Sequence, residues 1–263
     1  MEILSYNFLI YSLIVSILCS LSSALIGSWI VIKRRVLVSG GITHASFGGI
    51  GLGYFLGTNP IFGSILFAIA SAIGIEFVTR KKKLREDSAI GLFWSVGMAL
   101  GILFIYLTPG YAPDLMGYLF GNILTVNITD IIISSALAVI LTLFFIINHH
   151  RILYVAFDEN YAEIQHVNVI RHNVTMMILT ALTIVVNIKV SGIIMVISML
   201  CIGQSAANII TSKYKTIIVL SFLFNVLACG AGLLISWFLN IPSGATIILV
   251  LSSIYFVTRL VKR

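Results

Sequence analysis

Few side chains in this sequence could carry out chemistry, and His44 is the candidate metal ligand among them. It lies in a run of small and apolar residues, Ser39-Gly40-Gly41-Ile42-Thr43-His44-Ala45-Ser46. Ionisable residues inside apolar spans are costly and mark functional sites, and a neutral imidazole is a common ligand of zinc, manganese and iron. The alternative is an interfacial histidine that hydrogen-bonds to the backbone, which the residue types alone favour.

Other reactive patterns are missing from the sequence. Cys19, Cys201 and Cys229 have no pairwise or Cys/His spacing that would predict a zinc knuckle or a disulfide framework. The chain contains no Gly-Lys dipeptide and therefore no phosphate-binding P-loop, and it has neither an HExxH nor a G-x-S-x-G element. We therefore expect no catalytic residues and no permanently bound cofactor, and any ATP hydrolysis must come from another polypeptide.

The longest polar stretch, residues 149–173, contains a short acidic segment. Phe157-Asp158-Glu159-Asn160-Tyr161-Ala162-Glu163-Ile164 predicts a short helix, with Asp158 as its N-cap and Glu159 in the first turn. Such a helix is a plausible docking surface for a soluble partner. An ordinary solvated loop is the alternative, and the residues alone do not separate the two.

The composition excludes a soluble globule. Only 10% of the 263 residues are charged, against about 25% in a soluble domain. The net charge of +7 does not indicate nucleic-acid binding, because the basic residues form short blocks between apolar runs, as cytoplasmic loops do. The sequence predicts an all-α, polytopic transmembrane helix bundle.

Nine apolar windows could cross a bilayer, where a span needs about 20 apolar residues. Placing basic blocks such as Lys33-Arg34-Arg35 on the inside predicts an external N-terminus, an internal C-terminus and nine crossings. The count falls if 174–211 is a single helix broken near Ser191-Gly192, so we expect eight or nine spans with short or broken helices. The windows are 8–32, 44–57, 60–79, 89–107, 128–148, 174–188, 190–211, 216–239 and 243–260.

Two more ionisable residues fall within or beside these windows. Glu76 precedes Arg80 by four residues, a spacing at which two side chains meet on one helix face. We therefore expect an ion pair between them. Lys189 lies at an expected outer turn, from which its side chain can reach lipid headgroups.

Several blocks, in order, resemble integral-membrane permease subunits of ATP-binding-cassette importers for zinc, manganese or iron. The resemblance extends from about Gly27 to Tyr255. The blocks are Gly27 to Arg34 followed by the His44 element, Glu86-Asp87-Ser88-Ala89-Ile90-Gly91, Asp114 to Leu124, Phe157-Asp158-Glu159 with Ala162, Gly192 to Ala207, and Pro242-Ser243-Gly244-Ala245.

This resemblance implies a single permease domain over 1–263, with a cytoplasmic coupling loop at 149–173. His44 would be a metal ligand in the translocation path, and Phe157, Asp158, Glu159 and Ala162 would dock on a separate cytoplasmic ATPase that uses ATP. It also implies a homodimer in a prokaryotic cytoplasmic membrane, an extracytoplasmic metal-binding protein, and a divalent metal ion as cargo.

The sequence departs from the family pattern at three places, one of them Gly203-Gln204-Ser205-Ala206-Ala207, where the late segment commonly carries proline followed by small residues. Gly40 stands where many members have an acidic residue, and His166 stands where the docking element often ends in glycine. Two other functions are compatible with the residues: an ATP-independent secondary transporter or channel, and a membrane scaffold that transports nothing. Transport that persists without an ATPase would indicate the first, and the lack of any metal-dependent phenotype would indicate the second.

Overall fold

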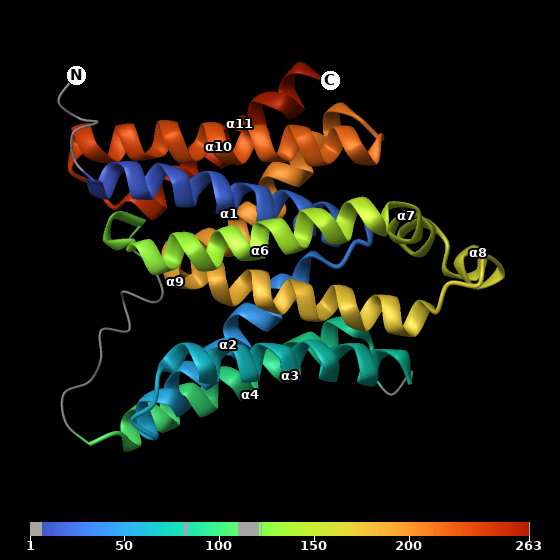
Figure 1. Ribbon diagram of the computed structural model, residues 1–263, viewed down its shortest axis with the longest axis horizontal. Helices are drawn as coiled ribbons and strands as arrows, with labels where there is room; N and C mark the ends of the chain where they lie inside the picture. Colours follow the sequence, from blue (N-terminus) through green and yellow to red (C-terminus); the bar gives the residue numbers. More distant parts are fainter. Residues whose placement is uncertain (1–6, 82–83, 110–120, 122, 263) are drawn as a thin grey trace. The chain divides into compact units, whose positions relative to one another are not determined.

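The computed structural model describes residues 7–81, 84–109, 121 and 123–262. All regular structure among them is helical (Figure 1), which confirms the all-α prediction. Eight helices of these residues are long and apolar enough to cross a membrane, within the predicted range. The chain forms two compact units, described in turn below. The expectation of a single permease domain stays a prediction, and Asp114 to Phe120, part of one resembling block, lie outside the described residues.

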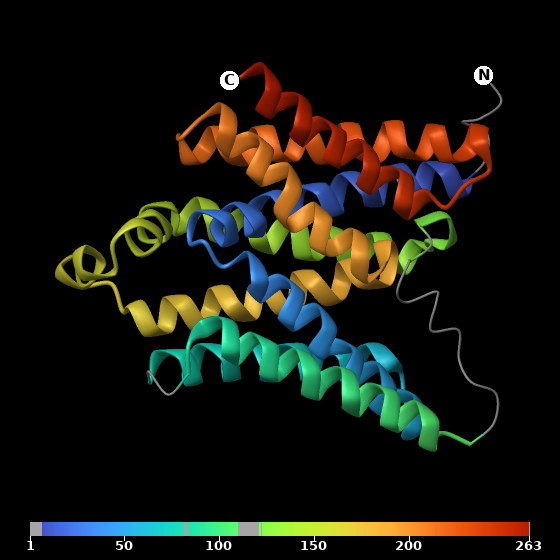
Figure 2. The same ribbon diagram turned by 180° about the vertical axis from the view of Figure 1, so that it is seen from behind.

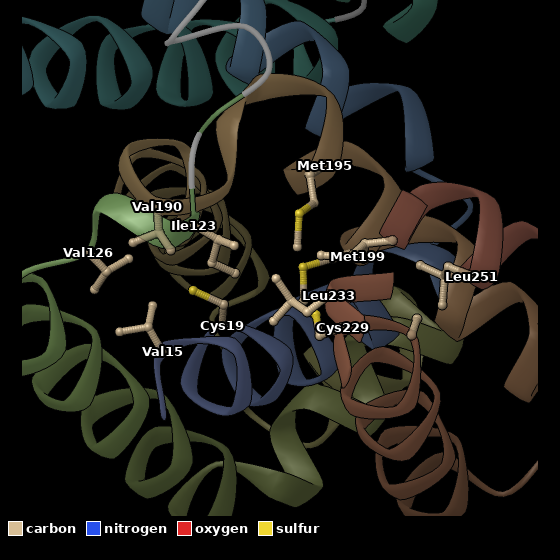
Figure 3. Packing of buried hydrophobic residues seen from close by; sticks show 12 residues of the cluster. Val15, Cys19, Ile123, Val126, Val190, Met195, Met199, Cys229, Leu233 and Leu251 are labelled. Atoms are coloured by element: carbon tan, nitrogen blue, oxygen red, sulfur yellow. The ribbon is translucent and has the colours of Figure 1, made fainter. Parts of the chain in front are cut away.

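Unit 1 comprises Met1–Ile32, Met116–His149 and Val186–Arg263. Helix α10 packs against both α1 and α11, and α1 also packs against α6. Figure 3 shows the buried core, in which Val15 and Cys19 of α1 cluster with Cys229 and Leu233 of α10. Cys19, Cys201 and Cys229 are all free thiols. The helices are α1 (Asn7–Ile32), η2 (Ile123–Thr125), α6 (Ile128–Ile147), the later part of α9 (Val169–Ile210), α10 (Tyr214–Leu239) and α11 (Ser243–Val261).

Helix α9 is broken where the sequence predicts a break. Its 42 residues would extend about 63 Å as one straight helix, roughly twice the hydrocarbon thickness of a bilayer. Gly192 has φ 76° and ψ 166°, a conformation essentially restricted to glycine. Gly121 packs against this break, because a Cβ there would lie 2.3 Å from the backbone of Ser191 and Gly192. Residue 192 therefore ends one helical segment and starts another.

The start of α1 and the end of α11 lie at opposite ends of unit 1 (Figures 1 and 2). A chain that crosses a bilayer an odd number of times must begin and end on opposite sides. Counting the two segments of α9 as separate spans makes the number of candidate spans among the described residues odd. Which end faces the cytoplasm stays a prediction.

Unit 2 comprises Lys33–Leu115 and His150–Val185. Helix α2 packs against both α3 and α4. The prediction that the second window begins at His44 is wrong, because α2 begins eight residues earlier, at Val36. The helices are α2 (Val36–Phe55), α3 (Pro60–Arg80), α4 (Glu86–Leu107), most of α7 (His149–Phe157), α8 (Glu159–Ile164) and the first part of α9.

Glycines explain both the packing of α2 and the mistaken helix start. A Cβ on Gly49 would lie 2.0 Å from the carbonyl oxygen of Gly63 in α3, and one on Gly51 would lie 2.4 Å from that of Gly101 in α4. Small residues allow helices to approach this closely within a membrane. Because these small residues contribute little hydropathy, an average over a window of sequence does not detect the start of α2.

Candidate functional site

His44 lies near the middle of α2 and is half-buried. Its imidazole stacks on the indole of Trp94 in α4, with ring centroids 4.2 Å apart and planes inclined by 9°. His44 Nδ1 is buried and forms no hydrogen bond with any described residue. A buried ring nitrogen without a partner is unusual and leaves a lone pair or a proton available to a ligand.

No group of three or more His, Cys, Asp or Glu side chains that could hold a metal ion lies among the described residues. Gly40, one turn before His44, supplies no side chain. Within the described part of the chain, His44 is therefore a candidate metal ligand that no cluster of further ligating side chains accompanies.

An ion-pair network surrounds the start of α2. Arg35 Nη1 lies 2.7 Å from Glu76 Oε2, and Arg35 Nε lies 3.1 Å from Glu86 Oε1. Glu76 is only 4% exposed, so removal of Arg35 would leave a buried carboxylate without its ion-pair partner. The expected Glu76–Arg80 pair is wrong, because packing of α2 against α3 brings Arg35 to Glu76.

Asp158 caps the short helix α8, as its sequence predicts. Its Oδ1 accepts hydrogen bonds from the backbone N–H groups of Asn160 at 2.9 Å and Tyr161 at 3.1 Å. These donors would otherwise be unpaired at the helix start. The carboxylate therefore holds the helix end in place.

Glu159 attaches α8 to other parts of unit 2. Its Oε1 lies 2.5 Å from Lys33 Nζ and accepts a hydrogen bond from Asn173 Nδ2 at 3.1 Å. Burial opposes the carboxylate charge, but the hydrogen bonds from Lys33 and Asn173 outweigh it, so the pKa of Glu159 lies below its ordinary value. Lys33 lies three residues before α2, the helix that carries His44. The ion pair therefore connects α8 to the turn that precedes α2.

The two remaining predicted docking residues differ in exposure. Ala162 is fully buried, in a small cluster with Val155 and Val169. Phe157 is 66% exposed. Of the four predicted side chains, Phe157 is the one that offers an unoccupied apolar surface.

Two exposed apolar residues continue this surface, and the sequence analysis missed them. Tyr161 is 43% and Ile164 is 72% exposed. Tyr161 and Ile164 lie three residues apart on one face of α8, a signal that was available in the sequence, whereas Phe157 ends α7 before the extended residue Asp158. We call Tyr161 and Ile164, together with Phe157 at the end of α7, the apolar face of α8.

The polar segment after α8 lies beside an open pocket. His166 follows the helix with φ 58°, in the left-handed region where helices commonly end with glycine. This explains why a glycine suits the position in proteins with the resembling pattern. A pocket of about 370 Å³ is lined by Arg80, Glu163, His166, Val167, Asn168, Val169 and Ile170.

Unit 1 places its polar side chains differently. Lys189 forms an ion pair with Asp130 at the start of α6, which corrects the expectation that it reaches lipid headgroups. Gln204 Nε2 donates to the carbonyl oxygens of Ser23 at 2.8 Å and Met199 at 2.9 Å, and Asn225 Nδ2 donates to that of Met199 at 3.0 Å. These two amides are fully buried, and the sequence analysis did not single them out.

Comparison with known proteins gives consistent matches over nearly the whole chain. A family model described as the ABC 3 transport family matches residues 5–262. The chain is 37% identical over 262 residues to an uncharacterized membrane protein of Synechocystis sp., covering 100% of this chain and 93% of that protein. It is 33% identical over 255 residues to the manganese transport system membrane protein MntC of Listeria monocytogenes, covering 97% and 91%. The solved structure of PsaBC from Streptococcus pneumoniae in complex with Fab matches with a TM-score of 0.87 and 29% identity, covering 98% and 92%.

Proposed function

The chain belongs to the ABC 3 transport family, and on that basis we propose that it is the membrane permease subunit of an ATP-driven importer of a divalent transition-metal ion. It is a multi-pass membrane protein and a transport subunit rather than an enzyme. The observation that carries the metal assignment is the half-buried His44 on α2, with a ring nitrogen that has no partner among the described residues.

His44 acts as a ligand in the metal path. A neutral imidazole binds zinc, manganese and iron. A single protein ligand holds the ion weakly enough to release it, whereas a complete chelating cage would trap it. Because a relative is named as a manganese transport protein, Mn²⁺ is the first metal to test, with zinc and iron as competitors.

The apolar face of α8 docks on a separate cytoplasmic ATPase. Three exposed apolar side chains, one at the end of α7 and two on one face of α8, suit a groove on a partner protein. Asp158 and Glu159 serve this role indirectly, since the first caps α8 and the second ties it to Lys33. A movement of α8 would thus reach the turn before α2, where ATP-dependent changes in the partner could shift the balance between inward- and outward-facing states.

The complete transporter contains a homodimer of this chain, a separate cytoplasmic ATPase and an extracytoplasmic metal-binding protein. The chain lies in a prokaryotic cytoplasmic membrane with its N-terminus outside and its C-terminus inside. The basic blocks near the expected inner helix ends support this orientation.

Metal uptake into proteoliposomes that contain the complete complex tests the proposal. We expect Mn²⁺ uptake that requires ATP, and a reduction of about tenfold or more in His44→Ala. His150→Ala, an equivalent change at an exposed position of α7, is the matched control and should leave uptake unchanged. Uptake that continues without the ATPase would favour the secondary transporter or channel instead.

Copurification of the ATPase tests the docking surface. We expect Phe157→Ser and Ile164→Ser each to weaken ATPase binding by about tenfold or more, as for exposed apolar anchors of an interface. Phe238→Ser, at a 71% exposed position of α10 in unit 1, is the control. Equal ATPase recovery with all three variants would refute the docking assignment.

A further inference from the structure

Trp94 covers the candidate metal ligand from a different helix. Its indole lies parallel to the His44 imidazole at a centroid distance of 4.2 Å, the geometry of an aromatic stack. Trp94 is itself 37% exposed. One face of the imidazole is therefore occupied by a large π system, whereas Nδ1, which has no hydrogen-bond partner among the described residues, lies at the edge of the ring outside the stacked face.

Gly40 leaves the room that this arrangement needs. A Cβ at position 40 would lie 3.4 Å from Trp94 Cζ3 and 3.9 Å from Trp94 Cη2. Gly40 precedes His44 by one helical turn, so both residues lie on the same face of α2. The indole thus extends over two successive turns of α2, and a larger side chain at position 40 would compete with it for space.

The stack has two physical consequences for a metal ion bound to His44. The torsion about the Cβ–Cγ bond of histidine is broad, and the parallel indole limits it, so the ring is held in one plane. An imidazole that binds a divalent cation also gains positive charge, and a cation over the face of tryptophan is attracted by its quadrupole. The indole therefore favours the metal-loaded form of the ring over the empty one.

We infer that Trp94 is a positioning residue of the metal path, which orients the His44 imidazole and stabilises its metal-bound form by stacking. This inference rests on the proposed function, since it takes His44 as a ligand. Trp94 could otherwise be an aromatic residue that merely anchors α4 at the membrane interface. An anchoring residue would affect folding and insertion but not the metal affinity of His44.

Transport kinetics separate positioning from anchoring. In the complete complex we expect Trp94→Leu to raise the KM for Mn²⁺ uptake by about three- to tenfold, with Vmax within about twofold of the wild type. Trp94→Phe, which can still stack, should restore KM to within about twofold. Gly40→Leu should raise KM as Trp94→Leu does, whereas Gly40→Ala should not. Trp237→Leu, on α10, is the matched control.

A spectroscopic measurement on the purified full-length chain tests the contact without transport. With Trp29→Phe and Trp237→Phe introduced, Trp94 is the only tryptophan, and we expect titration with Mn²⁺ or Co²⁺ to quench its fluorescence with saturation. The quenching should be lost when His44→Ala is added. Saturable quenching that survives His44→Ala would overturn the inference.

The two experiments distinguish failure of the inference from failure of the proposed function. If His44→Ala abolishes uptake while Trp94→Leu keeps the wild-type KM, the inference is overturned and the metal path stands. If His44→Ala transports normally, the assignment of His44 under the proposed function is wrong. If the complex shows no ATP-dependent uptake, the proposed function fails, and the fluorescence titration still decides whether Trp94 reports metal binding at His44.

Discussion

Each unit contains an ion pair with a buried acid, but the two units differ in the other side chains that join their helices. In unit 1 the buried amides of Gln204 and Asn225 donate to backbone carbonyl groups. In unit 2 glycines bring α2 into backbone contact with α3 and α4, and Arg35 pairs with two acids at the start of α2. Neutral hydrogen bonds within a membrane bundle contribute about 0.6 kcal/mol on average, whereas a buried charge that loses its partner costs far more. Unit 2, which carries the candidate ligand and the anchored helix α8, therefore has more to lose at Arg35, which pairs with two acids, than unit 1 has at Gln204 or Asn225.

Removal of Arg35 should reveal this difference most strongly. Arg35→Met leaves Glu76 buried without its partner, and we expect a loss of about 3–5 kcal/mol of stability, measured by thermal unfolding in detergent. Arg34→Met, at the adjacent exposed residue, is the control and should have little effect. Equal unfolding temperatures for the two variants would show that the charges are dispensable in unit 2.

The glycine contacts should show the next largest effect. Gly49→Ala places a Cβ 2.0 Å from the Gly63 carbonyl oxygen, and overpacking of this kind costs about 1–3 kcal/mol. Gly91→Ala is the matched control, because nothing lies within 4 Å of a Cβ at that position of α4. We expect the control to unfold at or above the wild-type temperature, since alanine favours a helix. If Gly49→Ala were as stable as Gly91→Ala, close packing of α2 would not be a requirement of unit 2.

In unit 1 the loss of one amide should be milder. Gln204→Leu removes two hydrogen bonds but no charge, and we expect a loss of about 1–2 kcal/mol in the same unfolding assay. The KM for metal uptake should stay at the wild-type value, because the hydrogen bonds of Gln204 all lie within unit 1 and His44 belongs to unit 2. A loss as large as that of Arg35→Met would remove the distinction between the two units.

The smallest effect on stability should come from Glu159. The Glu159 side chain is 44% exposed, so solvent screens its pair with Lys33, and Glu159→Gln should cost about 0.3–1 kcal/mol at neutral pH. Because folding lowers the pKa of Glu159, this stabilisation is complete above the ordinary glutamate pKa and is lost as the pH falls through the lowered value. The stability difference between wild type and Glu159→Gln should therefore shrink in acid.

The same variant has a functional expectation. Glu159→Gln should still bind the ATPase through the apolar face of α8 but transport less metal for each ATP hydrolysed. The ratio of uptake to phosphate release in proteoliposomes measures this. An unchanged ratio would contradict the proposed route from α8 to α2 through Lys33.

Local patterns in the sequence were enough for much of the fold. Apolar windows predicted all the long helices, the Asp158 cap follows from a side chain and its next two backbone N–H groups, and Gly192 marks the break in α9. The predicted start of α2 was wrong because glycine and serine add little to an apolar window. These residues are buried only because α2 packs closely against α3 and α4.

The sequence by itself determined the all-α membrane architecture, the position of the helix break and cap, and His44 as the candidate ligand, because each depends on residue type or on neighbours within one or two turns. Only the tertiary structure decided that Glu76 pairs with Arg35 rather than Arg80, that Glu159 is tied to Lys33, and that Trp94 covers His44. These contacts join residues 41 to 126 positions apart or on different helices. Helix packing selects such partners, and no local spacing encodes them.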